Sequence, residues 1–112
     1  MAKKISSIKK IIKVYIEILK SKGIHVETVI LYGSQATGFA NDDSDIDIII
    51  ISDDLKLISF PERLGFLSQA TLNIPEPLEV IGYTRDEVKN KNGKSVFWDE
   101  ICSKGKIIYT AA

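Results

Sequence analysis

The 112-residue chain has little of the chemistry that builds disulfides and thiolate metal sites, because it contains one cysteine, Cys102, and one histidine, His25. One cysteine cannot form an internal disulfide, and the two residues together cannot supply the ligands of a structural zinc site. They also give no support to a cysteine–histidine nucleophile. We expect Cys102 to be a small buried hydrophobic residue.

The chain also lacks an excess of charge and a long apolar run. Lys and Arg number 15, as do Asp and Glu, so the net charge gives no indication of nucleic-acid binding. No apolar stretch approaches membrane-spanning length, and the start of the chain carries no signal-peptide pattern. We therefore expect a cytoplasmic protein with no membrane contact. Its length suits one domain over residues 1–112, without room for a second lobe.

Charge is unevenly distributed along this neutral chain. Seven lysines lie in the first 22 residues beside one acid, Glu17, whereas six aspartates lie between Asp42 and Asp54. A lysine-rich helix face is most often a solvated surface, and we interpret it so here. The concentrated aspartates, by contrast, need cations nearby.

Apolar periodicity predicts an α/β fold with a small mixed sheet of about four strands and helices packed on it. A helix is expected over 3–22, with its apolar face at Ile5, Ile8, Ile12, Tyr15, Ile16 and Leu19. Strands are expected over 26–31, 46–51, 78–83 and 106–109, the second of them central. A second helix is expected over 60–72, with Leu64, Leu67 and Ala70 packing inward. A third is expected from residue 84 to a break at Asn92–Gly93. The last is expected over 95–103, capped by Ser95, and its core-facing residues are Phe97, Trp98, Ile101 and Cys102.

The most informative stretch runs from Leu31 to Ile51, where two apolar runs bracket a glycine turn and a pair of carboxylates. Residues two apart in a strand share a face, so Asp45 and Asp47 point the same way. Like charges this close repel unless a proton or a cation lies between them, and a hard divalent ion such as Mg²⁺ is the usual solution. We expect Asp45 and Asp47 to hold magnesium.

The turn at Gly33–Ser34 has the features of an anion-binding site, which complements the expected metal site at Asp45 and Asp47. A strand followed by Gly-Ser and a short helical start directs backbone N–H groups and a hydroxyl toward an anion, and glycine allows the anion to come close. A nucleoside triphosphate would satisfy both halves, with magnesium bridging its phosphates to the aspartates.

Three other interpretations of this stretch have requirements of their own. A P-loop needs lysine and a hydroxyl residue after its second glycine, but Phe39–Ala40 follow Gly38. An EF-hand loop starting at Asp43 would need glycine where Ile48 stands. A merely solvated polar turn remains the common explanation of an isolated Asp-x-Asp, and the accompanying Gly33–Ser34 argues against it here.

Gly33–Ser34, ten intervening residues and Asp45–Ile46–Asp47 together resemble the signature of the polymerase-beta-like nucleotidyltransferase superfamily. At this length the chain resembles its minimal nucleotidyltransferase (MNT) branch. The resemblance implies a third carboxylate on a neighbouring strand that completes the metal site and draws the proton from the attacking hydroxyl. Glu79 is our choice for it and Glu76 the second, although an exposed edge-strand glutamate is an equal alternative for Glu79.

The same resemblance implies an enzyme, a metal-dependent nucleotidyltransferase with two Mg²⁺ ions held by Asp45, Asp47 and Glu79, and ATP bound at Gly33 and Ser34. Relatives of this branch work as antitoxins beside a HEPN-type partner, and some transfer AMP to a tyrosine of that partner. The alternative is a non-catalytic antitoxin that neutralises its partner by binding.

Many relatives carry a basic residue just after Gly-Ser and another nearby, where this chain has Gln35 and Thr37. The departure predicts weak or absent turnover. Because the chain has no acceptor domain, we expect the acceptor on another molecule or another copy, and nucleic acid is not an expected partner. The nucleotide, the acceptor and the oligomeric state, including a homo-oligomer, are left open by the sequence.

Overall fold

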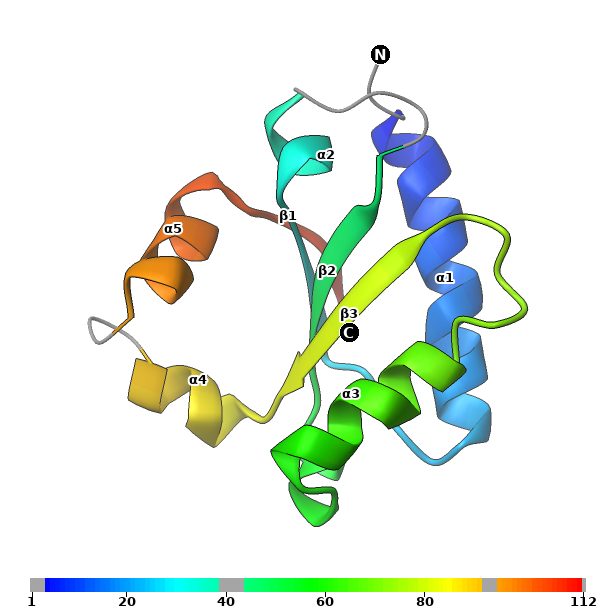
Figure 1. The fold of residues 1–112 in the computed structure, drawn as a ribbon, viewed down its shortest axis with the longest axis vertical. Helices are drawn as coiled ribbons and strands as arrows, with labels where there is room; N and C mark the ends of the chain where they lie inside the picture. The colour runs from blue at the N-terminus through cyan, green and yellow to red at the C-terminus, as the bar shows by residue number, and fades with distance from the viewer. Residues whose placement is uncertain (1–3, 39–43, 92–94, 112) are drawn as a thin grey trace.

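A computed structural model describes residues 4–38, 44–91 and 95–111 of the chain (Figure 1). Four strands form one mixed sheet in the order β3-β2-β1-β4. Their bounds are β1 Thr28–Tyr32, β2 Ile46–Ile51, β3 Leu78–Tyr83 and β4 Lys106–Thr110. The helices are α1 Ile5–Ser21, α2 Ser34–Thr37, α3 Phe60–Gln69, α4 Arg85–Lys91 and α5 Val96–Lys104, with a short 3-10 helix η1 at Asp53–Leu57. The predicted α/β class with a four-stranded mixed sheet is confirmed.

The central strand is β2, as its run of isoleucines predicts. It pairs antiparallel with β1 and parallel with β3, while β4 pairs antiparallel with the other side of β1. Ile48, Ile49, Ile50 and Ile51 are all buried, so both faces of this strand are covered beyond Asp47. The sheet therefore separates two apolar layers.

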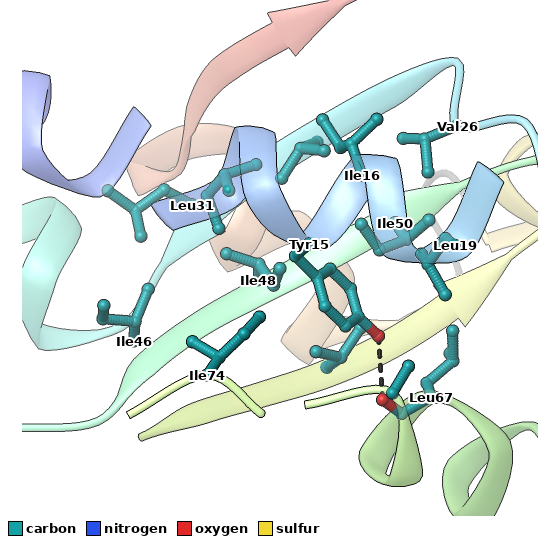
Figure 2. Close-up of a cluster of buried hydrophobic side chains, with 14 of the residues drawn as sticks. Tyr15, Ile16, Leu19, Val26, Leu31, Ile46, Ile48, Ile50, Leu67 and Ile74 are labelled. Carbon is teal, nitrogen blue, oxygen red and sulfur yellow. Dashed lines mark hydrogen bonds between the residues drawn. The ribbon is translucent and has the colours of Figure 1, made fainter. Parts of the chain in front are cut away.

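The larger layer lies between the sheet and the helices α1 and α3. The predicted inner face of α1 is confirmed, since Ile8, Ile12, Tyr15, Ile16 and Leu19 are buried. They pack against Ile46, Ile48 and Ile50 of β2 and against Leu67 of α3. Figure 2 shows the Tyr15 hydroxyl reaching across this layer to donate a 2.8 Å hydrogen bond to the Leu67 carbonyl.

The smaller layer lies on the opposite face, which α4 and α5 cover (Figure 1). Trp98 and Ile101 of α5 pack against Ile49 and Ile51 of β2 and against Tyr83 of β3. The predicted cap of α5 is confirmed, because the Ser95 hydroxyl accepts a hydrogen bond from the Trp98 N–H at 3.2 Å. The odd-numbered residues of β2, Asp47 among them, face this smaller layer.

Several local expectations were wrong. The segment after β2 forms η1 rather than a loop, and α3 ends at Gln69, three residues before the predicted end. On α3, Leu67 and Ala70 are buried as expected but Leu64 is 45 % exposed. On α5, Phe97 is 52 % exposed and Cys102 is also exposed. The α5 face that contacts the core is therefore narrower than its apolar residues suggested.

Two expectations fall outside the described residues: the Asn92–Gly93 break and the contribution of Asp42 and Asp43 to the acidic cluster. Within the described ranges, no helix is long and apolar enough to cross a membrane.

Candidate functional site

Gly33 ends β1 in a conformation that favours glycine, with φ of 71°. A side chain at this position would also collide with Oδ2 of Asp47, which lies directly against the glycine. The sequence predicted that Gly33 allows an anion to approach the backbone. In the structure, the group that occupies this close approach is the Asp47 carboxylate itself.

Asp47 is paired with a second carboxylate from the neighbouring strand. Glu79 is its register partner in the parallel pairing of β2 and β3, so both side chains leave the same face of the sheet. The two carboxyl groups lie close enough to share a hydrogen bond when one of them is protonated. Burial, that hydrogen bond and the negative charges of Glu79 and Asp45 raise the pKa of Asp47 to about 6. Glu79 is thus an exposed edge-strand residue that also lies beside Asp47, and its part in completing a metal site stays a prediction.

Asp45 lies at the same end of the sheet but is more open to solvent. Its charge raises the pKa of Asp47, yet within the described ranges no three histidine, cysteine or acidic residues come together as ligands for a metal ion. Glu76, the second choice for the third carboxylate, precedes β3 and is half-buried. The close pair at this site is therefore Asp47 with Glu79.

The short helix α2 begins at Ser34, which is half-buried beside Gly33. Its next residue, Gln35, is 3 % exposed and donates a hydrogen bond from Nε2 to the Ser44 carbonyl at 3.2 Å. This bond ties the glycine turn to the chain that leads into Asp45. Gln35, noted from the sequence as a neutral residue in place of a basic one, is buried in the protein.

Tyr32 belongs to the site although the sequence did not single it out. It is the register partner of Asp47 across the β1–β2 pairing. Burial, followed by the negative charges of Asp47 and Glu79, raises the pKa of the Tyr32 hydroxyl to about 12. The only sequence signal was its place directly before Gly33, which does not reveal which residue lies opposite it.

A cavity of about 510 Å³ opens between the Gly33 turn and α5. Its walls come from the end of β1, from α2 and from the last two turns of α5: Tyr32, Gly33, Thr37, Phe97, Glu100, Ile101, Lys104 and Gly105. Phe97 meets Tyr32 edge to face with 6.0 Å between ring centroids. Gly33 borders both this cavity and Asp47, so an occupant of the cavity would lie next to the acidic pair.

Several solved structures share this fold. A protein from Sulfolobus solfataricus assigned as a nucleotidyltransferase superimposes with a TM-score of 0.59 at 22 % identity, over 95 % of this chain and 79 % of the other. A toxin–antitoxin structure with AMP-PNP gives a TM-score of 0.60 at 17 % identity, over 88 % of this chain and 73 % of the other. At these identities the likeness concerns the fold alone. A search of curated proteins found no match.

The family profile described as "Polymerase beta, Nucleotidyltransferase" matches residues 8–112, which span every strand of the sheet, the Gly33 turn and all three carboxylates singled out from the sequence. Nucleotidyl transfer is the general chemistry that this family supports. The chain therefore belongs to the polymerase beta nucleotidyltransferase family.

Proposed function

We propose that this protein is a metal-dependent nucleotidyltransferase that moves a nucleoside monophosphate, AMP from ATP, onto a hydroxyl group of a partner protein. The observation that carries the proposal is the Asp47–Glu79 pair held against Gly33 at the edge of a cavity. Family membership supports the transfer chemistry.

The donor set suits magnesium. Burial, the side-chain hydrogen bond to Glu79 and the nearby negative charges raise the pKa of Asp47 to about 6, so a cation bound between the two carboxylates would relieve their repulsion. Magnesium needs only one or two protein carboxylates and takes its other ligands from water and phosphate oxygens. Asp47, Glu79 and the more exposed Asp45 would hold two such ions, which would neutralise charge on the transferring phosphoryl group.

The protein's own groups would position and deprotonate the reactants. Glu79, exposed at the sheet edge, would accept the proton of the attacking hydroxyl, whose oxygen bonds to the α-phosphorus. The bond from that phosphorus to the bridging oxygen breaks, and pyrophosphate leaves. Gly33 and Ser34 would orient the departing pyrophosphate beside Asp47.

The acceptor is proposed on a partner, in the manner of an antitoxin acting on a HEPN-type toxin. The structural neighbour described as a toxin–antitoxin with AMP-PNP supports a nucleotide and a partner protein for this fold. The nine helices and strands with the short η1 take up the described chain and leave no separate acceptor lobe within it.

The test is incubation with α-labelled ATP, magnesium and the product of the neighbouring gene. We expect label on the partner, and at least a hundredfold less with Asp47→Asn, since metal-site ligands act as a unit. Asp53→Asn is the control, because this aspartate lies on η1 and pairs with Arg85 away from the site. Equal labelling by wild type and Asp47→Asn would refute the enzymatic proposal.

A second candidate is a non-catalytic antitoxin that neutralises its partner by binding. It is favoured by the neutral side chains at positions 35 and 37, which leave α2 without a cation. Calorimetry of the two proteins without ATP separates the candidates. Tight binding that Asp45→Ala leaves unchanged, together with no labelling, would identify a binding module.

A further inference from the structure

The glycine turn lacks a cation of its own for a polyphosphate. On α2, Gln35 is buried and bonded to Ser44, and Thr37 is a neutral residue on the cavity wall. Asp45, Asp47 and Glu79 add negative charge on the other side of Gly33. A triphosphate entering the cavity would therefore meet an acidic surface unless another element supplies positive charge.

The C-terminal helix α5 brings a lysine to this place. Lys104 is its last residue and is the one cation among the described residues that line the cavity, across from Gly33 and Thr37. The next residue, Gly105, fixes this geometry, since a Cβ there would lie 3.2 Å from the Leu31 carbonyl oxygen and closer still to the Ile101 carbonyl. The end of α5 is thus seated on the end of β1, two residues before Gly33.

Lys104 forms an exposed ion pair with Glu100 that can be broken with little loss of free energy. Its ammonium lies 2.8 Å from Glu100 Oε1 one helical turn earlier, and the two side chains are 64 % and 59 % exposed. Exposed pairs of this spacing contribute little to stability, so a more highly charged anion can displace the glutamate. Glu100 also lines the cavity and would repel that anion once it has lost the lysine.

We propose that Lys104 binds the β- and γ-phosphates of the nucleoside triphosphate, replacing the basic residues that α2 lacks, and that Glu100 restrains this lysine in the free protein. The inference rests on the proposed nucleotidyltransferase function and names the residue that binds the leaving pyrophosphate. Turnover then depends on α5 as well as on the turn after β1.

Calorimetric titration with α,β-methylene-ATP and magnesium tests the assignment, because this analogue binds without transferring AMP. We expect Lys104→Gln to weaken binding about tenfold, the effect of losing a partly exposed charge-assisted contact, and Lys104→Arg to restore most of it. Glu100→Gln should tighten binding by about twofold. Lys20→Gln on α1 removes the same charge from an exposed position on the other side of the sheet and should leave binding unchanged.

Titration with AMP separates contact with the terminal phosphates from a general electrostatic effect. Lys104→Gln should change the dissociation constant for AMP by less than about twofold, since AMP has no β- or γ-phosphate. An equal loss for both ligands, or none for the triphosphate, would overturn the role of Lys104 while leaving the proposed function intact. If the wild-type protein binds no nucleotide at all, the proposed function itself fails.

Discussion

Asp47 is the central residue of the site, because three other described residues of the site lie around it. Gly33 lies against its carboxylate, Glu79 bonds to it from β3, and Tyr32 is opposite it on β1. Acidic side chains half-buried beside other acids are costly, and proteins hold such arrangements mainly where a ligand uses them. The carboxylate is consequently sensitive to small displacements of the turn.

Substitution of Gly33 by alanine tests this sensitivity. Gly33 and Gly38 have similar positive φ values, 71° and 84°, but only at Gly33 would a Cβ meet Asp47. Gly38→Ala should lose about 1–2 kcal/mol of unfolding free energy from strain at its left-handed φ and ψ, and Gly33→Ala should lose more, since its ψ of −158° lies in a region that glycine alone ordinarily adopts. Gly33→Ala should lose further unfolding free energy because its new Cβ would collide with Asp47, and it should abolish nucleotide transfer.

Chemical denaturation and the labelling assay measure the two effects. Comparable activity in Gly33→Ala and Gly38→Ala would mean that the contact between position 33 and Asp47 does not position the carboxylate.

The sequence predicted the parts of the site that lie close together along the chain. Asp45, Asp47 and Gly33 were found because i, i+2 alternation and a glycine turn are local patterns. Tyr32 and Lys104 were not singled out from the sequence, because their places on the cavity wall depend on strand register and on how α5 is seated, which no local spacing encodes. The sequence noted Gln35 only for its lack of charge, because the direction of its side chain depends on the path of the chain at Ser44.

Among the elements, α4 is attached by a cap at its first turn and by a hydrogen bond to α3. Thr84 and Glu87 form a reciprocal cap, in which the Thr84 N–H donates to Glu87 Oε1 at 2.7 Å and the Glu87 N–H donates to Thr84 Oγ1 at 3.3 Å. Glu87 Oε1 also accepts a hydrogen bond from the buried Arg63 of α3. One carboxylate therefore both starts α4 and fixes it to α3.

This attachment predicts a pH dependence of stability. Burial alone would raise the pKa of Glu87, but hydrogen bonds from Arg63 and Thr84 outweigh it and hold the pKa below its ordinary value of 4.5. A lowered pKa in the folded state stabilises the fold above pH 4.5, and this contribution is lost as the pH falls through the folded value. Thermal unfolding between about pH 6 and pH 3 should therefore show a shallower decline for Glu87→Gln than for wild type.

Glu62→Gln, which removes one exposed carboxylate from α3, is the matched control. If both variants follow the wild-type curve, the hydrogen bond between Arg63 and Glu87 makes no pH-dependent contribution to stability in this range.

The sequence located every strand to within about two residues, because each strand is a compact apolar run between breakers. Boundaries were wrong where short-range capping decided them: Ser52 accepts a hydrogen bond from the Asp54 N–H at 3.3 Å and begins η1 in what was expected to be a loop. The capping pattern Thr84-x-x-Glu87 was equally visible in the sequence and was overlooked.

At the scale of the whole molecule, one hydrogen bond crosses the larger core layer (Figure 2). Tyr15 of α1 and Leu67 of α3 are 52 positions apart, and the Tyr15 hydroxyl is buried. A bond between such distant segments joins the first helix to the middle of the chain. Loss of this bond should lower the free energy of global unfolding rather than cause local fraying of one helix.

Tyr15→Phe leaves the Leu67 carbonyl without this donor inside the core. We expect a loss of about 1–2 kcal/mol in unfolding free energy with an unchanged denaturant dependence. Tyr109→Phe is the control, since among the described residues the half-buried Tyr109 hydroxyl has no hydrogen-bond partner. Equal effects of the two substitutions would show that the Tyr15–Leu67 bond adds no net stability.

Gly105 packs against β1 and joins two parts of one continuous segment, residues 96–110, which have different structural roles. Residues 96–104 wall the cavity, and residues 106–110 complete the sheet by pairing with β1. Binding and ordering are thermodynamically linked when the same residues serve both. Whatever fills the cavity should accordingly slow amide exchange along β4, an edge strand that it never touches.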